Sequence, residues 1–231
     1  MKISSPHRDI AAWYDDLSTG WGKNYASGDS HFNRRMQNVH LLAEKLNEDA
    51  EILDIGCATG EITSSLHSRF KCKTTGIDIS SKMIDHCHAT YRDKNVFFKV
   101  GDILSLQFND NNFDLVVSLS VIEWIDNYEK AISEVSRVLK HGGQWIVSIP
   151  NWCSPFRIIE SITQKIRKQN YLQYQKNKLK VAEFECIAEK YGLKKNAAIY
   201  HVLPFYSKNV GGSVGSFLGM MCIMSLSKKQ V

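Results

Sequence analysis

The sequence lacks any segment that would export the chain or hold it in a bilayer. Residues 1–9 contain no apolar run of the kind that a secretory signal requires. The uncharged stretch 209–227 is interrupted by four glycines and four serines, so it falls short of the roughly 20 apolar residues of a spanning helix. We expect buried strand and loop there, and a cytoplasmic protein that does not integrate into membranes.

Paired cysteines are also missing. The six cysteines show no C-x-x-C spacing and no spacing typical of a disulfide framework, so we expect reduced thiols. The triplet His86-Cys87-His88 does not indicate a metal site, because adjacent residues point to different sides of a helix or strand. We expect no bound metal.

Internal repeats and linkers rich in proline, glycine or serine are absent too. The 231 residues are 43% hydrophobic and 23% charged, as in ordinary soluble globular proteins. This composition excludes collagen, low-complexity disorder and polytopic membrane proteins, and it favours a single domain.

What the sequence does contain is an alternation of apolar strands and helices. Short apolar runs that end in glycine, serine or proline alternate with segments of helical spacing, which indicates a parallel sheet covered on both faces. The alternation of strands and helices ends after Pro150. A basic segment, a helix near 181–191 and two late strands near 197–203 and 217–226 follow. The five regular strands are predicted at 51–56, 74–79, 95–100, 113–118 and 144–149. A helix from about 128 to 139 is predicted to stop at Gly142 and Gly143, which can adopt a left-handed cap.

The loop that joins the first strand to the first helix carries the first functional signal. Residues 54–60 read Asp-Ile-Gly-Cys-Ala-Thr-Gly, and small residues there let a ligand and the backbone approach closely. The dinucleotide fingerprint G-x-G-x-x-G/A would need a third small residue at position 61, where this chain has Glu61. A glutamate at the start of that helix would oppose a pyrophosphate, so NAD binding is not expected.

The ends of the next strands carry acidic and small groups. Asp78 ends the second strand, 18 residues after Gly60, where a carboxylate can accept hydrogen bonds from both hydroxyls of a ribose. Asp102 follows the third strand and Ser118 ends the fourth. Each could be a helix cap or a turn residue when taken alone. Four successive strand ends at one crevice favour a nucleoside-binding site.

Taken together, these motifs resemble the class I S-adenosylmethionine-dependent methyltransferases. The match comprises residues 52–60, Gly76-Ile77-Asp78, Gly101-Asp102-Ile103, the strand 113–117 and the turn Leu139-Lys140-His141-Gly142-Gly143. It covers residues 35–150 well and is most similar to the small-molecule branch that includes ubiquinone-pathway O-methyltransferases and malonyl-carrier-protein methyltransferases.

The resemblance implies an α/β fold and a division of the chain. The expected fold is a doubly wound, Rossmann-like sheet of seven strands, mostly parallel with the last strand antiparallel, and with helices on both faces. A single methyltransferase domain would comprise an N-terminal helical lid (1–48), a cofactor-binding core (49–150), an inserted basic segment on the substrate side (151–180), and a final helix with strands (181–231).

The resemblance also implies S-adenosyl-L-methionine as cofactor, with S-adenosyl-L-homocysteine as product. Asp54 would order the glycine loop that passes under the methionine moiety, and Asp78 would bind the ribose hydroxyls. Ile79 would pack on the adenine, while Asp102 and the backbone of Ile103 would bind its edge. The full set of expected cofactor-binding residues is Arg35, Asp54, Gly56, Cys57, Ala58, Gly60, Asp78, Ile79, Asp102, Ile103 and Leu119.

Two positions depart from the family. The central glycine of the loop is Ala58 here. Some ubiquinone-type members carry Glu-x-x-Glu-His after the fourth strand and recruit a divalent metal, whereas this chain has Ser120-Val121-Ile122-Glu123-Trp124. Only Glu123 remains, which argues against metal assistance and against that substrate class.

The charge distribution indicates the kind of acceptor. Residues 1–150 carry a net charge of −4 and residues 151–231 one of +9. A solvated surface would explain this, but a basic wall at 155–180 also suits an acceptor with a carboxylate, a phosphate or a carrier-protein phosphopantetheine. Lys165, Arg167 and Lys168 are the residues whose charge reversal should then raise the acceptor KM.

The expected function is therefore methyl transfer to oxygen or nitrogen of a small, anionic or carrier-linked molecule by in-line displacement. No catalytic base is assigned; Tyr14, Tyr25, His31 and His201 are candidates on the expected lid and the last strands. The alternatives are a nucleic-acid methyltransferase, which no Asn/Asp-Pro-Pro-Tyr/Phe-type motif supports, and a membrane-surface or partner-binding module with residues 155–169 as a basic amphipathic helix. Nucleic acid is not the expected partner, peripheral membrane association stays open, and the oligomeric state is not determined.

Overall fold

The computed structural model describes residues 11–12, 14–15, 30–167, 175–201, 209–210 and 212–230. Residues 11–12 and 14–15 are helical. The strands are β1 (Glu51–Ile55), β2 (Lys73–Asp78), β3 (Val96–Val100), β4 (Phe113–Ser118), β5 (Leu139–Pro150), β6 (Leu193–His201), β7 (Asn209–Val210) and β8 (Met221–Lys228). The helices are α2 (Ser30–Leu42), α3 (Glu61–Phe70), α4 (Ser81–Thr90), α5 (Tyr128–Val138), α6 (Pro155–Arg167), α7 (Val181–Lys190) and α8 (Gly212–Leu218), with a short 3-10 helix η1 (Ile122–Trp124).

The strands form one sheet in the order β3-β2-β1-β4-β5-β8-β6-β7. Strands β1 to β5 are parallel, and β8 pairs antiparallel with both β5 and β6. The expectation of a doubly wound, mostly parallel sheet of seven main strands whose last strand is antiparallel is confirmed. β7 is an additional two-residue edge strand that pairs with Tyr200 and His201 of β6.

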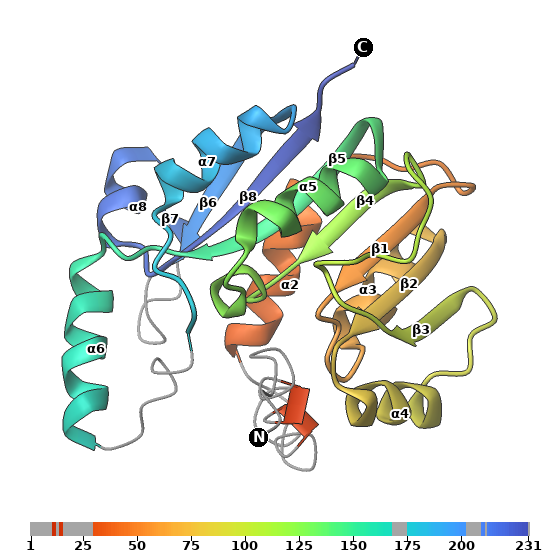
Figure 1. Ribbon diagram of the computed structural model, residues 1–231, viewed down its shortest axis with the longest axis horizontal. Helices are drawn as coiled ribbons and strands as arrows, with labels where there is room; N and C mark the ends of the chain where they lie inside the picture. The colour runs from red at the N-terminus through yellow and green to blue at the C-terminus, as the bar shows by residue number, and fades with distance from the viewer. Residues whose placement is uncertain are drawn as a thin grey trace, which may run out of the picture.

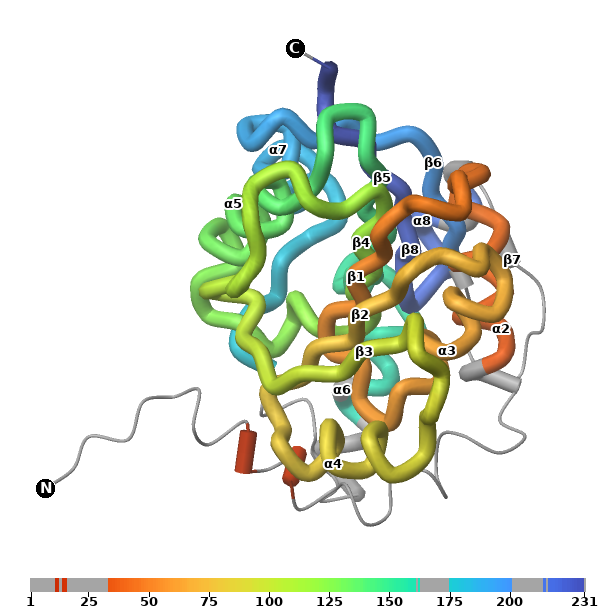
Figure 2. Tube along the Cα trace, turned by 90° about the vertical axis from the view of Figure 1, so that its right-hand side faces the viewer, coloured from red at the N-terminus to blue at the C-terminus, as the bar shows by residue number. Residues whose placement is uncertain are grey.

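Helices cover both faces of this sheet. Figure 2 shows α5 and α7 on one side of the strands and α2 and α3 on the other. Successive side chains of β1 point to opposite faces of the sheet. Leu53 packs in the core cluster that includes α5 and α7, and Ile52 packs in the cluster that includes α2 and α3. Both residues are fully buried, so both faces of β1 are covered.

The order of the strands fixes where a ligand can bind. The winding reverses between β1 and β4, which are neighbours in the sheet although β2 and β3 separate them in the sequence. In open α/β sheets ligands bind outside the carboxyl ends of the strands at such a switch point. The loops that follow β1 and β4 meet at this point.

Two local expectations differ from the structure. The first concerns the turn at 140–143. Helix α5 ends at Val138, and Gly142, with φ of 78°, lies inside β5, where the pairing with β4 jumps from Phe113–Leu139 to Leu115–Gln144. The two glycines therefore make a bulge at the start of a strand rather than the cap of a helix.

The second difference is α8, because we expected strand and loop throughout 209–227. Contacts far away in the sequence stabilise this helix: Asn151 Nδ2 donates to the carbonyls of Ser216 and Gly219, each at 2.7 Å, and Ser154 Oγ donates to the carbonyl of Leu218 at 2.9 Å. These bonds satisfy carbonyls at the end of α8 that have no partner within the helix. The late strand accordingly begins at Met221 rather than near 217.

None of the helices in the described part of the chain combines the length and the apolar character needed to cross a membrane.

Candidate functional site

The predicted site residues of the first four strands meet at one edge of the sheet. The parallel pairing brings the ends of β1, β2, β3 and β4 side by side, and each is followed by predicted residues. Gly101 N–H donates to the carbonyl of Asp78 at 2.9 Å, which ties the ends of β2 and β3 together.

The glycine loop is held as a tight turn by the neighbouring strand. The N–H groups of Gly56 and Cys57 both donate to the carbonyl of Ile77 in β2, at 2.8 and 3.0 Å, and Gly60 N–H donates to the carbonyl of Cys57 at 2.9 Å. Gly56 and Gly60 have φ of 72° and 89°, and Ala58 adopts the left-handed region as well, at 47°. The loop is thus preorganised without a ligand.

The glycines of this loop allow close contact between parts of the protein itself. A Cβ atom on Gly56 would lie 2.5 Å from Val121 Cγ2, and one on Gly60 would lie 2.7 Å from Tyr91 Cε2. We expected the small residues to make room for a ligand. For these two glycines the structure shows a nearer reason, which is packing against Val121 after β4 and Tyr91 after α4.

Asp54 anchors the loop to the first helix after it. It lies in β1, is 2% exposed, and accepts a hydrogen bond of 2.6 Å from Thr63 Oγ1 in α3. Burial, together with the charges of Asp78 and Glu61, raises the pKa of this carboxyl to about 7, although the bond from Thr63 opposes the shift. The side chain therefore ties β1 to α3 across the loop, and its role in ordering the loop stays a prediction.

Asp78 is fixed by backbone hydrogen bonds at the end of β2. Its Oδ2 accepts from the N–H of Ala58 and its Oδ1 from the N–H of Ser80, each at 2.9 Å. Burial raises its pKa, and these backbone bonds oppose the shift. Since a carboxylate has about four lone-pair sites, each oxygen keeps capacity for one further donor. The carboxylate therefore has the position and the capacity to bind two hydroxyl groups.

The remaining predicted residues line the same edge. Asp102 is half-buried and its Oδ1 accepts from the N–H of Leu104 at 2.9 Å. Ile79 is half-buried beside Asp78, whereas Ile103 and Leu119 are 6% and 7% exposed. The structure thus places these residues around the ends of β2, β3 and β4, and their roles in binding the cofactor stay predictions.

Arg35 reaches this edge from helix α2. Its Nη2 donates to Ser120 Oγ at 3.1 Å, just after β4. Its positive charge partly opposes the rise in the pKa of Asp54 and of Glu123 that burial causes. The predicted basic residue is therefore at the site, on the side of β4.

Glu123 is a site residue that the sequence analysis did not assign. It is 3% exposed in η1, and burial raises the pKa of its carboxyl to about 7, while the charges of Arg35 and Arg157 oppose the shift. Its backbone carbonyl accepts from the N–H of Lys176 at 3.0 Å. The only sequence feature that could have pointed to Glu123 was its position one residue before Trp124, in the segment that differs from the metal-binding members of the family.

The described part of the N-terminal segment touches the same edge. Asp15 Oδ1 accepts from Ser80 Oγ at 2.5 Å, beyond the end of β2. The ring of Tyr14 lies edge-on to that of Trp124, with the centroids 6.3 Å apart. The segment therefore contacts both the β2 loop and the β4 loop.

Some predicted residues fall outside the described part of the chain. Tyr25 and Lys168 lie outside it entirely, and the side chains of four others, which are His31, Lys165, Arg167 and His201, lie outside it as well. Their proposed roles therefore stay predictions.

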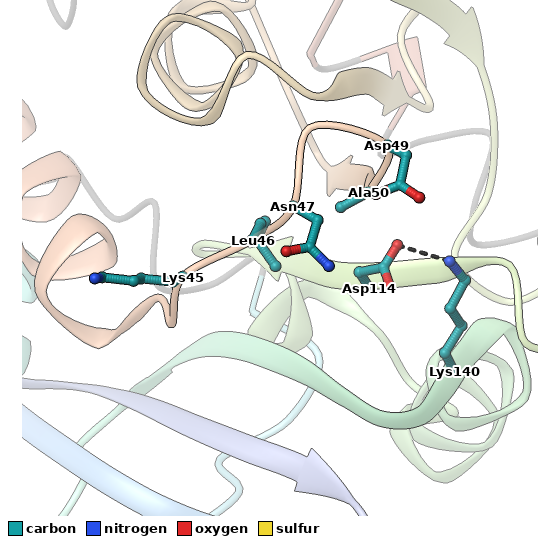
Figure 3. A pocket seen from close by; sticks show the side chains of 7 residues that line it. All are labelled: Lys45, Leu46, Asn47, Asp49, Ala50, Asp114 and Lys140. Carbon is teal, nitrogen blue, oxygen red and sulfur yellow. Dashed lines mark hydrogen bonds and ion pairs between the residues drawn. The ribbon is translucent and has the colours of Figure 1, made fainter.

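A polar pocket lies at the opposite edge of the sheet. Figure 3 shows it between the α2–β1 connection and the starts of β4 and β5, where Lys140 Nζ and Asp114 Oδ2 form an ion pair of 2.8 Å. It is remote from the strand ends that carry the predicted site, because it lies at the amino ends of the parallel strands. Its lining residues are Lys45, Leu46, Asn47, Asp49, Ala50, Asp114 and Lys140.

Comparison with known families gives a match that coincides with the core of the site. Residues 53–147 match the family described as "Methyltransferase domain". This range contains the last three residues of β1, all of β2 to β4, most of β5, and all the predicted cofactor residues except Arg35.

Several curated proteins are similar in sequence. The sterol 24-C-methyltransferase erg-4 of Neurospora crassa is 28% identical over 150 residues, which are 58% of this chain and 40% of that protein. The fatty-acid O-methyltransferase of Mycolicibacterium smegmatis is 31% identical over 126 residues (51% and 46%). A malonyl-[acyl-carrier protein] O-methyltransferase of Acetivibrio thermocellus is 27% identical over 132 residues (55% and 46%). The chain spans 40 to 46% of the length of these three relatives.

Solved structures share the fold over nearly the whole chain. The geranyl diphosphate C-methyltransferase of Streptomyces coelicolor A3(2) superposes with a TM-score of 0.73 at 15% identity and covers 99% of this chain and 100% of that one. A possible histamine N-methyltransferase of Thermotoga maritima gives 0.70 at 21% identity, with coverage of 97% and 100%. The strand order and the glycine loop, together with the match of residues 53–147 to this family, support a class I S-adenosylmethionine-dependent methyltransferase domain.

Proposed function

We propose that the protein is an enzyme that transfers a methyl group from S-adenosylmethionine to oxygen or nitrogen of a small, anionic or carrier-linked molecule. The observation that carries this proposal is the arrangement at the carboxyl edge of the sheet. A preorganised glycine loop and Asp78 lie beside Leu119 and Ser120, at the switch point between β1 and β4.

The charge of the site fits this cofactor better than a dinucleotide. Four carboxyl groups lie around the glycine loop: the charges of Asp78 and Glu61 contribute to the raised pKa of Asp54, and the charge of Asp15 contributes to the raised pKa of Asp78. A cluster of carboxylates repels a pyrophosphate and attracts a cation. S-adenosylmethionine carries a sulfonium and an ammonium group, whereas its carboxylate suits the guanidinium of Arg35.

Different residues of the chain would bind different parts of the cofactor. Asp78 would hold the two ribose hydroxyls with the lone pairs that its backbone bonds leave open. Ile79 and Ile103 would enclose the adenine, and Arg35 would pair with the carboxylate of the methionine moiety. When bound, the cofactor supplies a methyl group on a sulfonium, which a nucleophile displaces in line.

Positioning is the main catalytic contribution that we assign to the protein. Holding two reactants aligned in a dry site can lower a barrier by about 7–11 kcal/mol at best. We propose that the segment before α2 acts as a lid, because Asp15 and Tyr14 contact the loops after β2 and β4, whereas α2 itself packs against the sheet. Such a lid would exclude water during the transfer.

The chemistry of the acceptor is inferred from charge and from the relatives. A net charge of +9 in residues 151–231 favours an anionic molecule. Two similar proteins are named for O-methylation of a fatty acid and of malonyl-[acyl-carrier protein], which are carboxylates. Others are named for methylation of sterol carbon, so C-methylation is the outcome to test against O- and N-methylation.

The cofactor is tested by calorimetric titration of S-adenosylhomocysteine into wild type, Asp78→Ala and Asp78→Asn. We expect micromolar binding to wild type and a loss of about 100-fold or more in both variants, since one or two charge-assisted hydrogen bonds disappear. Asp85→Ala, an exposed aspartate on α4, is the matched control and should bind as wild type does.

Thermal unfolding of the same variants separates binding from folding. Equal affinity in wild type and in folded Asp78 variants would contradict the assignment of the ribose site. A screen of carboxylate, phosphate, amine and sterol acceptors with labelled methyl donor would then identify the atom that is methylated.

A specific observation favours peripheral membrane association as a second function. Helix α6 projects from the end of β5 (Figure 1), and Ile158, Ile159 and Ile162 on it are each more than half exposed. Phe217 of α8 is 63% exposed as well. Flotation with liposomes that contain or lack anionic lipid tests this function, and absence of association in both would remove it.

A further inference from the structure

Four buried side-chain atoms on the side of β4 and β5 have no hydrogen-bond partner among the described residues. They are Trp152 Nε1, Arg157 Nε, Gln175 Oε1 and Glu123 Oε2. Buried polar atoms in folded proteins are nearly always paired, because an unpaired one costs about 1–3 kcal/mol. Four such atoms in one region call for a common explanation.

Contacts link Trp152, Arg157 and Glu123 in one cluster, and Gln175 is next in the chain to Lys176, whose backbone bonds to Glu123. The guanidinium carbon of Arg157 lies 5.8 Å from the centre of the Trp152 ring, and Lys178 Nζ lies 5.5 Å from it. Glu123 interacts electrostatically with Arg157. The carbonyl of Glu123 accepts from the N–H of Lys176, the residue after Gln175, at 3.0 Å. The cluster therefore joins the β4 loop, the β5 loop and the segment that precedes α7.

The positions of the two donors are fixed by other contacts. Arg157 is 5% exposed; its Nη1 forms an ion pair with Glu160 Oε2 at 2.7 Å, and its Nη2 donates to the carbonyl of Met220 at 3.1 Å. Each terminal nitrogen therefore has a partner, whereas the Nε–H group has none among the described residues. Trp152 follows Asn151, whose side chain holds the end of α8. The guanidinium of Arg157 is therefore held in place, and the ring of Trp152 packs beside it.

We propose that Trp152, Arg157 and Lys178, which we call the donor cluster, bind the anionic group of the methyl acceptor, a carboxylate or a phosphate. The indole N–H and the Arg157 Nε–H would each donate to an anionic oxygen. Lys178 would add charge from the exposed side. This inference rests on the proposed function and specifies where the acceptor binds.

The local charge agrees with an anionic ligand. Arg157, Lys178 and Arg35 supply three positive charges and Glu160 neutralises one, while Glu123, whose pKa is raised to about 7, carries only part of a negative charge near neutral pH. Because hydrogen bonds to a charged group are about twice as strong as neutral ones, an anion would compensate both orphaned donors. Gln175 Oε1 and Glu123 Oε2 would accept from the hydroxyl or amine that is to be methylated.

The test uses the full chain saturated with S-adenosylhomocysteine and labelled with nitrogen-15, with inorganic phosphate and malonate as separate probes. The five tryptophans give five indole signals, and Trp152→Phe identifies that of Trp152. We expect at least one of the two anions to shift this signal in a saturable way. By calorimetry, Trp152→Phe, Arg157→Lys and Lys178→Gln should each weaken binding of that anion by about 5-fold or more, since each loses one charged contact.

The matched control is Lys194→Gln. Lys194 is an exposed lysine near the start of β6, opposite the carboxyl edge, and its substitution should leave anion binding unchanged. Phosphate without malonate binding would indicate a phosphorylated acceptor, and the reverse a carboxylate. Equal anion affinity in wild type and in folded variants, or no anion binding, would overturn the donor cluster.

Measuring the binding of S-adenosylhomocysteine alongside that of the anions distinguishes a failure of the donor cluster from a failure of the proposed function. If S-adenosylhomocysteine binds and neither anion does, the donor cluster is wrong and the proposed function stands. If an anion binds through the donor cluster and S-adenosylhomocysteine does not bind, the proposed function is wrong instead.

Discussion

The two halves of the carboxyl edge treat their polar groups differently. In the cofactor half, which comprises the loops after β1, β2 and β3, the aspartates Asp54, Asp78 and Asp102 all accept hydrogen bonds from the protein. In the acceptor half, which comprises the loops after β4 and β5 and residues 175–178, buried donors and acceptors stay unpaired. The first half pairs its carboxylates with donors of the protein, whereas the second keeps buried polar atoms that have no partner among the described residues.

The difference has a physical reason. Hydrogen bonds within the cofactor half fix a loop of glycine and alanine at positive φ, which would otherwise be strained or mobile. The acceptor half is built on a turn and a helix that Asn151 and Ser154 already hold in place, so its free groups are not needed for folding. We therefore expect substitutions in the two halves to separate stability from binding.

The largest effect is expected where the two halves touch. Gly56→Ala places a Cβ at 2.5 Å from Val121 Cγ2, on a residue with φ of 72°. Backbone strain of about 1 kcal/mol and overpacking of up to about 3 kcal/mol should lower the free energy of unfolding by about 4 kcal/mol.

Gly192→Ala is the matched control for this substitution. Gly192 has φ of 76°, but nothing lies within 4 Å of an added Cβ, so only the strain of about 1 kcal/mol remains. Urea unfolding of both variants measures the difference. Equal losses would mean that the contact between the Gly56 loop and Val121 is not tight.

A smaller effect, with a defined pH dependence, is expected from Glu123→Gln in the acceptor half. Burial raises the pKa of Glu123 from 4.5 to about 7 in the folded state. The folded state therefore binds a proton that the unfolded state releases between these values, and stability falls as the pH rises through this window. Glutamine carries no charge, so the variant should gain stability relative to wild type, by on the order of 3 kcal/mol above pH 7.

Urea unfolding of wild type and Glu123→Gln between pH 4 and 8 checks this expectation. Glu48→Gln, at an exposed position, should follow wild type throughout. A stability difference between the two proteins that does not change with pH would show that folding does not raise the pKa of Glu123.

The smallest effect is expected from Thr63→Val in the cofactor half. Loss of the bond of 2.6 Å to Asp54 should cost about 1 kcal/mol of stability and raise the pKa of Asp54 further, because this bond favours the charged form. Binding of a cationic cofactor near pH 7 should weaken by a few-fold, and calorimetry measures it.

Thr63→Ser keeps the hydroxyl and is the control for this substitution. Unchanged cofactor affinity in Thr63→Val would mean that the charge of Asp54 does not contribute to binding. The contrast between the cofactor half and the acceptor half would then rest only on the geometry of their hydrogen bonds, and not on the charge of Asp54.

The sequence by itself determined the sheet and the cofactor half. Apolar strands that end in glycine or aspartate have few alternative arrangements, and parallel pairing brings their ends to one edge. For this reason Asp54, Asp78 and Asp102 could be placed from local pattern, and the bounds of β1 to β4 agree with the prediction within about two residues.

Only the tertiary structure decided the acceptor half. Helix α8 forms because Asn151 and Ser154, more than 60 residues away in the sequence, satisfy its terminal carbonyls. The buried state of Glu123 depends likewise on Arg35, Arg157 and the carbonyl contact with Lys176, which come from three separate segments. Local residue pattern carries no signal for such contacts, because burial and charge pairing between distant segments arise only when the chain has folded.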